Sequence, residues 1–173
     1  LDRSIRDAEQ FKLHAPLAHW RRVRDEIHAQ VCERGVDPQR GVFKQSYEDA
    51  EPNASVLMIP LLGFLPVEDP RVQATIDWIQ QELQRNSLVY RFRPHRSEAG
   101  WEGSFRMVDN LIMSQRQEQA EAQFARLLAL RNDVGLLAEQ YHPQYGLLGN
   151  FPQALSHLAL VKSAYLIQAC EKV

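Results

Sequence analysis

Apolar residues recur at helical spacing along most of this chain of 173 residues. From residue 17 onward they stand three and four positions apart, which predicts a long helix with one buried stripe formed by Leu17, Trp20, Val23, Ile27 and Val31. Gly35 follows this pattern, where a helix C-terminal cap is expected. A second stripe predicts another helix with one face in the core, formed by Val72, Ile76, Ile79 and Leu83.

Residues that favour helix starts precede two of the patterns. Asp69 and Pro70 suit the N-cap and the first position of the helix that begins there, which is expected to stop around 86–87. Asn53 suits the cap of a second helix through 56–62. That segment is apolar on most sides, so we expect it to be buried between neighbours.

The later part of the chain alternates helical patterns with loops. Helices are expected at 105–113, at 118–130 and from Pro152 onward, where one stripe comprises Leu155, Leu158, Val161 and Tyr165. Extended segments are expected at 42–47 and 88–92, and long loops at 94–103 and 132–150.

No linker or low-complexity segment divides residues 1–173, so we predict a single all-α domain. Short links and long, glycine-bearing loops alternate between the helices. This organisation fits an array of helical hairpins, either a curved solenoid or part of an α/α toroid. In such arrays the long loops gather at one end, where functional residues are usually found.

Charge and cysteine content narrow the class of protein. The net charge is -2, from 20 basic and 22 acidic residues, and no basic stripe occurs, so nucleic acid is not an expected partner. The longest apolar stretch, 56–67, is too short and too interrupted to cross a membrane.

Cys32 and Cys170 are expected to be free buried thiols in a reducing compartment, which favours a cytoplasmic location; a single disulfide is the alternative. The chain opens without Met inside a helical pattern, which indicates a fragment of a longer protein.

The loop at 132–150 carries the best candidate for chemistry. Glu139 stands beside Gln140 and Tyr141, and a carboxylate near amide and phenol groups suits sugar binding. It also fits a solvated loop glutamate, and from composition alone that reading is the commoner one. Ser156 and His157 are adjacent on a helix, so their side chains diverge and do not form a nucleophile–base pair. The histidines lack metal-ligand spacing, and the glycines form neither a P-loop nor a dinucleotide-binding pattern, so no metal and no organic cofactor is expected.

Several strings resemble, in the same order along the chain, the glycoside hydrolases of family 15, which include glucoamylases, glucodextranases and bacterial trehalases. They are the Leu-Asp-Arg-Ser-Ile start, Phe-Lys-Gln-Ser-Tyr at 43–47, Leu-Leu-Gly-Phe-Leu-Pro at 61–66 with Asp-Pro-Arg-Val at 69–72, Leu-Val-Tyr-Arg-Phe at 88–92, the stretch 124–141, and Gly-Asn-Phe-Pro-Gln-Ala-Leu-Ser-His at 149–157.

The resemblance implies about half of an (α/α)6 barrel, in the C-terminal part of the catalytic domain. The family releases glucose with inversion, which needs a general acid and a general base. The base is placed at Glu139, and the acid lies upstream of Leu1. Residues implied to hold an oligosaccharide or disaccharide are Tyr141, Arg91, Trp101, Gln45 and Tyr47.

The sequence departs from the family pattern at three places. Ala138 replaces a serine next to the base, Asn53 stands where an aspartate is common, and a segment after Phe105 is shortened by about a helical turn or more. The alternative is therefore a non-catalytic helical-repeat module that serves in binding or as a scaffold. In either case half a toroid exposes helix faces that favour self-association. The glycosidic linkage, α-1,4, α-1,6 or α,α-1,1, stays open.

Overall fold

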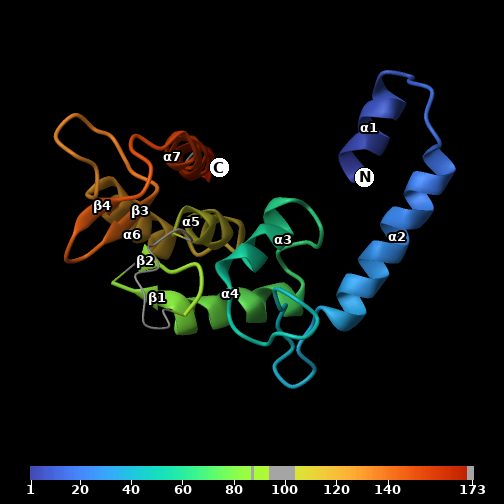
Figure 1. The fold of residues 1–173 in the computed structure, drawn as a ribbon, viewed down its shortest axis with the longest axis horizontal. Helices are drawn as coiled ribbons and strands as arrows, with labels where there is room; N and C mark the ends of the chain where they lie inside the picture. Colours follow the sequence, from blue (N-terminus) through green and yellow to red (C-terminus); the bar gives the residue numbers. More distant parts are fainter. Residues whose placement is uncertain (87, 94–103, 171–173) are drawn as a thin grey trace.

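The computed structural model describes residues 1–86, 88–93 and 104–170. In this part the chain is mostly helical, as predicted, with two short antiparallel hairpins (Figure 1). The elements are α1 (Asp2–Gln10), α2 (Leu17–Arg34), the 3-10 helix η1 (Ala54–Leu57), α3 (Met58–Leu61), α4 (Pro70–Leu83), β1 (Gln84–Arg85), β2 (Leu88–Val89), α5 (Ser104–Met113), α6 (Gln117–Leu128), β3 (Gln140–His142), β4 (Gly146–Leu148) and α7 (Ala154–Cys170).

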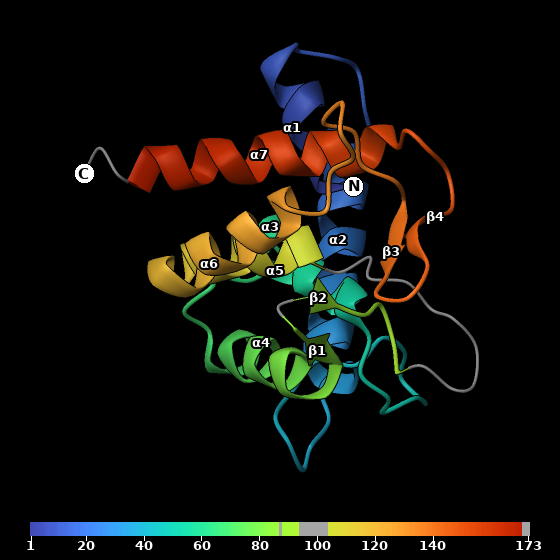
Figure 2. The same ribbon diagram turned by 90° about the vertical axis from the view of Figure 1, so that its left-hand side faces the viewer.

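Helices α4 to α7 form the array that positions the loops. Helix α5 packs against α6 and α7, and α4 packs against α5. Figure 2 shows the β1–β2 hairpin and the β3–β4 hairpin at the same end of these helices, whereas the short link from α5 to α6 lies at the other end. The β3–β4 hairpin, which lies within the predicted loop 132–150, is thus at the opposite end from the short α5–α6 link, whereas the predicted loop 94–103 lies outside the described residues.

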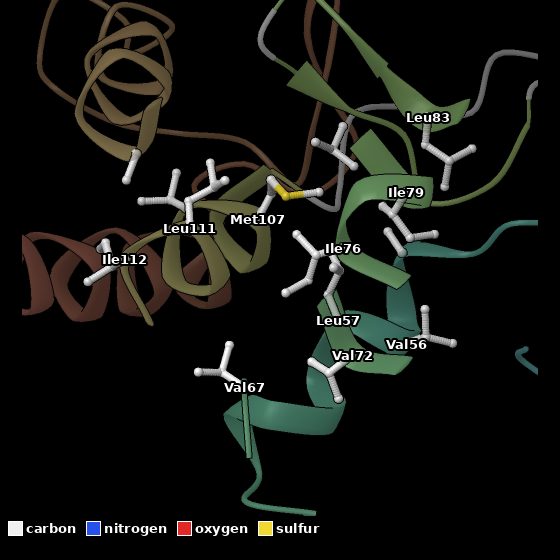
Figure 3. Packing of buried hydrophobic residues seen from close by; sticks show 14 of the residues in the cluster. Val56, Leu57, Val67, Val72, Ile76, Ile79, Leu83, Met107, Leu111 and Ile112 are labelled. Carbon is white, nitrogen blue, oxygen red and sulfur yellow. The ribbon is translucent and has the colours of Figure 1, made fainter. Parts of the chain in front are cut away.

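The core lies where α4, η1 and α5 meet. The four predicted core residues of α4, Val72, Ile76, Ile79 and Leu83, are all buried. Figure 3 shows them beside Val56 and Leu57 of η1 and facing Met107, Leu111 and Ile112 of α5. Removing these side chains from water supplies the main driving force for packing these elements, at about 25 cal/mol per Å² of apolar surface.

Two predicted helix caps are confirmed. The Asn53 side chain accepts a hydrogen bond from the Ser55 N–H at 2.9 Å and caps η1. The Asp69 carboxylate accepts from the Arg71 N–H at 2.9 Å, with Pro70 at the first position of α4. The Arg71 guanidinium also donates to Asp69, and chiefly for that reason the pKa of the Asp69 carboxyl lies below its ordinary value.

The prediction of a buried stripe on the long helix at 17–34 is wrong. The helix ends at Arg34 as expected, but none of its residues is buried, and Ile27 is 47% exposed. The reason is the position of α2: it pairs with α1 at the side of the molecule away from β3 and β4 (Figure 1), and Val31 alone of the stripe reaches the core cluster, where it is partly buried. Apolar residues at helical spacing form a helix face that could be buried, but the spacing does not determine whether another element packs on that face.

Other boundaries also differ from the predictions. The segment 42–47 forms no strand: Phe43 makes a single bridge with Val36, and its N–H donates to Thr75 of α4 instead. The helix expected at 56–62 is split into η1 and α3. Helix α4 ends at Leu83, and a positive φ at Asn86 belongs to the β1–β2 turn. The last helix begins at Ala154, two residues after the predicted start.

The predicted stripe of α7 faces away from the core. Its four members are 63% to 71% exposed: Leu155, Leu158, Val161 and Tyr165. The opposite side of the helix carries Ser163, which is fully buried, and Leu166 and Ile167, which pack on the core. Helix α7 is therefore apolar on both sides, and the described residues cover only the side that carries Ser163, Leu166 and Ile167.

Candidate active site

Glu139 lies in the irregular segment between α6 and β3, directly before β3. Leu137 and Ala138 are buried, whereas Glu139 is half-buried at the surface. The segment leaves a turn in which the Leu136 N–H donates to the Asn132 side chain at 2.7 Å, with Gly135 at a φ of 84°. The long loop predicted over 132–150 contains a short hairpin, because β3 (Gln140–His142) pairs with β4 (Gly146–Leu148). The hairpin returns the chain to Glu139.

The start of α7 holds this segment from the other side. The Gln153 N–H donates to the Leu137 carbonyl at 3.0 Å, and the Ser156 hydroxyl donates to the Ala138 carbonyl at 2.9 Å. His157 accepts from the Leu137 N–H through Nε2 at 3.3 Å, and its Nδ1 lies 2.7 Å from the Gln153 carbonyl, to which it donates. His157 is thus a hydrogen-bonding histidine, as the sequence indicated, and with Ser156 it positions the backbone beside Glu139.

The carboxylate of Glu139 is held at one oxygen. Asn150 donates to Oε2 through its backbone N–H at 3.1 Å and through its side-chain Nδ2 at 2.9 Å. The Glu139 N–H in turn donates to the Asn150 carbonyl at 2.9 Å. Among the described residues no hydrogen bond reaches Oε1. One carboxylate oxygen is therefore held by two donors of Asn150.

Gly149 makes this approach possible. A Cβ at this position would lie 2.9 Å from Oε2 and 3.1 Å from Cβ of Glu139, and its φ of 75° is one that side chains rarely adopt. Gly149 and Asn150 were not identified as site residues from the sequence. The available signal was a Gly-Asn pair close to the candidate base on the same loop.

Tyr141 and Glu139 line the same small cavity. Tyr141 pairs with Leu147 across the hairpin and packs against the core cluster. The cavity has a volume of about 50 Å³, and its other lining residues include Phe105, Leu130 and Ser156. The structure therefore brings together two of the predicted site residues at one cavity.

Gln45 and Arg91 line a second, larger pocket of about 430 Å³. The other lining residues are Asp49, Glu51, Pro52, Asn53, Phe92 and Arg93. The Ala54 N–H donates to the Arg91 carbonyl at 2.7 Å. This hydrogen bond joins the segment of Gln45 and Asn53 to the segment of Arg91, which together line the pocket.

Polar contacts hold this pocket in shape. Asn53 Nδ2 donates to Gln45 Oε1 at 2.5 Å. Arg93 donates to Glu82 at 2.5 Å and to Glu51 at 3.0 Å, and its pKa is raised, first by the hydrogen bond to Glu82. The pocket thus presents amide, carboxylate and guanidinium groups together, a set suited to hydroxyl groups.

The two remaining predicted residues are not placed in this pocket. Tyr47 is not among its lining residues; its ring lies 4.6 Å from the Arg34 guanidinium carbon, in a cation–π contact. Trp101 lies outside the described residues. Among the described residues, no three histidine, cysteine or acidic side chains are grouped so as to hold a metal ion. No helix in the described ranges has the length and apolarity needed to cross a bilayer.

The helical array is that of known glycosidases. A wild-type glycosidase structure superposes with a TM-score of 0.69 and 22% identity, over 91% of this chain and 45% of that one. A glycosidase variant solved in complex with glucose gives a TM-score of 0.68 and 20% identity over the same shares.

Sequence comparison assigns the family. The model of glycosyl hydrolases family 15 matches residues 1–105, so the chain belongs to this family. The trehalase of Mycobacterium tuberculosis is 39% identical over 182 aligned positions, and that of Thermoplasma acidophilum is 37% identical over 170. These alignments cover 99% and 94% of this chain, but only 27% and 29% of the trehalases.

Proposed function

We propose that this chain is the C-terminal part of the catalytic domain of an inverting glycoside hydrolase that releases glucose from α-glucosides. The observation that carries the proposal is the Glu139 carboxylate, with Oε2 held by Asn150 and Oε1 without a described partner, next to Tyr141. A general base needs a fixed orientation and one oxygen free to take the proton of water. The family assignment supports the reaction class.

In this mechanism Glu139 deprotonates a water molecule that attacks the anomeric carbon. The bond to the leaving oxygen breaks as a general acid protonates that oxygen, and the configuration inverts. The acid is assigned to a part of the protein preceding this chain. The chemistry uses side chains and water alone.

The substrate proposed is α,α-trehalose, among the α-glucosides, because the curated relatives are named trehalases. The pocket of Gln45 and Arg91 supplies hydrogen bonds to hydroxyl groups, and Tyr141 supplies a face for the sugar ring. Trp101 and Tyr47 are kept as further sugar contacts on the resemblance alone. We propose that the helices belong to about half of an (α/α)6 toroid, and the 45% share of the glycosidase chain that superposes supports this proposal.

The reaction is tested by ¹H NMR on the full-length protein with trehalose. Inversion at one α-linked carbon yields one β-glucose and one α-glucose, so the two anomers form at equal initial rates. Retention would yield only α-glucose at first, and absence of any glucose would favour the alternative. The isolated chain is expected to release no glucose, because one carboxylate does not supply both the acid and the base.

The alternative function is a non-catalytic helical module. One observation favours it: the alignment with the mycobacterial trehalase spans 182 positions, so the relative has residues that this 173-residue chain lacks. If the shortened segment after Phe105 removed part of the sugar site, binding could persist without turnover. A full-length protein that binds glucose but hydrolyses no α-glucoside would establish this reading.

We also propose that the isolated chain self-associates through the apolar stripe of α7. Leu155, Leu158, Val161 and Tyr165 are each more than 60% exposed, and a helix that is apolar on both sides is ordinarily covered on both. A two-fold dimer would place the same stripe of each copy against the other.

A cytoplasmic location is proposed because Cys32 and Cys170 are both free thiols. Both were expected to be buried, but Cys32 is half-buried and Cys170 is exposed.

Light scattering on the isolated chain tests the stripe. We expect a dimer or larger species for the wild-type chain and a monomer for Leu158→Glu, because a carboxylate in the middle of an apolar contact is costly to desolvate. The matched control is Glu118→Gln, at an exposed position of α6, which should leave the mass unchanged. A wild-type chain that stays monomeric at high concentration would contradict the proposal.

A further inference from the structure

We infer that Asn150 is the positioning residue of the general base and acts on the reaction only through Glu139. This inference rests on the proposed function. It adds a residue for which neither the sequence motifs nor the family assignment supplied a role.

The first argument is the pattern of hydrogen bonds. The backbone N–H and the side-chain amide of Asn150 both donate to the same carboxylate oxygen, at 3.1 and 2.9 Å. Two donors from one residue fix both the position of Oε2 and the plane of the carboxylate. Because each hydrogen bond to an ionised acceptor is stronger than a neutral one, the pair restrains the side chain firmly even at a half-exposed site.

The second argument is the backbone that carries Asn150. The Glu139 N–H donates to the Asn150 carbonyl at 2.9 Å, so main chain and side chain of the two residues are joined reciprocally. Gly149 leaves the space that the carboxylate fills, since a Cβ there would lie 2.9 Å from Oε2. Adjacent residues thus provide the donors and the room for one conformation of Glu139.

In the proposed reaction the two carboxylate oxygens of Glu139 therefore have different roles. Oε2 is engaged by Asn150, and Oε1 is the atom that takes the proton from water. Loss of the side-chain donor leaves the backbone bond in place, so the carboxylate remains near its position but samples more orientations. The effect should appear in kcat, whereas KM should change little because Asn150 does not line the pocket of Gln45 and Arg91.

A double-mutant cycle in the full-length protein tests this inference. Asn150→Ala is expected to lower kcat for trehalose by about tenfold or more, with KM within about twofold of wild type. Asn150→Asp has nearly the same shape but replaces the donor with a second carboxylate, so it should lose at least as much. A role in shape alone predicts instead that Asn150→Asp is tolerated.

The Glu139→Ala variant tests whether Asn150→Ala lowers the rate only through its contact with Glu139. Sodium azide attacks the anomeric carbon without a general base, breaking the bond to the leaving oxygen while the acid protonates it, and gives β-glucosyl azide. In this background Asn150→Ala should leave the azide rate unchanged. An equal tenfold loss there, or wild-type kcat in Asn150→Ala, would overturn the inference. Failure of the proposed function is distinct: Glu139→Ala itself would then hydrolyse trehalose at the wild-type rate.

Discussion

Replacing Glu139 with glutamine is expected to lower kcat for trehalose hydrolysis by the full-length protein roughly 1,000-fold, with KM changed by less than about tenfold. The glutamine side chain has the same shape, and its amide oxygen can still accept from Asn150 at the position of Oε2. The other terminal atom then becomes an NH₂ group, which donates and cannot take a proton from water. Binding of sugar therefore persists while activation of water is lost.

The measurement is initial glucose release over a range of trehalose concentrations, with Glu118→Gln as the control for loss of an exposed carboxylate elsewhere. The thermal midpoint of each variant checks that the fold is retained. A kcat within about threefold of wild type would show that Glu139 is not the base, whatever its contacts with Asn150. An equal fall in both variants would point to a nonspecific charge effect.

The sequence predicted the helices of the array better than the site. Stripes such as Val72 and Ile76 combine helical spacing with a clean cap at Asp69, and the helix that they predict is present and buried on that face. The stripe of α2 has the same spacing, yet the described part of the chain buries none of its residues, so periodicity alone did not determine whether the stripe is buried. The exposed stripe of α7 illustrates the same limit, since its core-facing side was not the side with the clearest apolar pattern.

At the site, the motif located Glu139 but not the residues that hold it. Asn150 is eleven positions away, and the contact depends on the β3–β4 hairpin, whose strands are only three residues long. Strands this short carry too little alternation to be recognised from sequence. Gln45 and Arg91 were found through separate strings, and only the fold places them in one pocket.

An ion pair joins Lys162 of α7 to the buried Asp109 of α5, and breaking it gives the largest expected effect on stability. Asp109 is 4% exposed; its Oδ1 accepts from the Ser163 hydroxyl at 2.5 Å, and its Oδ2 lies 2.8 Å from Lys162 Nζ. The lysine side chain is itself 52% exposed. Removing the cation thus leaves a buried carboxylate with one neutral partner, whereas removing the carboxylate leaves a lysine that water can solvate.

We therefore expect Lys162→Met to destabilise the chain by about 3 kcal/mol, which lowers the thermal midpoint by about 6–12 °C. Adding Asp109→Asn in the same chain should recover more than half of that loss, because it removes the uncompensated charge while keeping an acceptor for Ser163. Circular dichroism melts of the two variants, with Lys12→Met as an exposed control, provide the comparison. If the double variant melts below Lys162→Met, the cost lies in lost packing of the lysine stem, and Asp109 does not fix α7 through its charge.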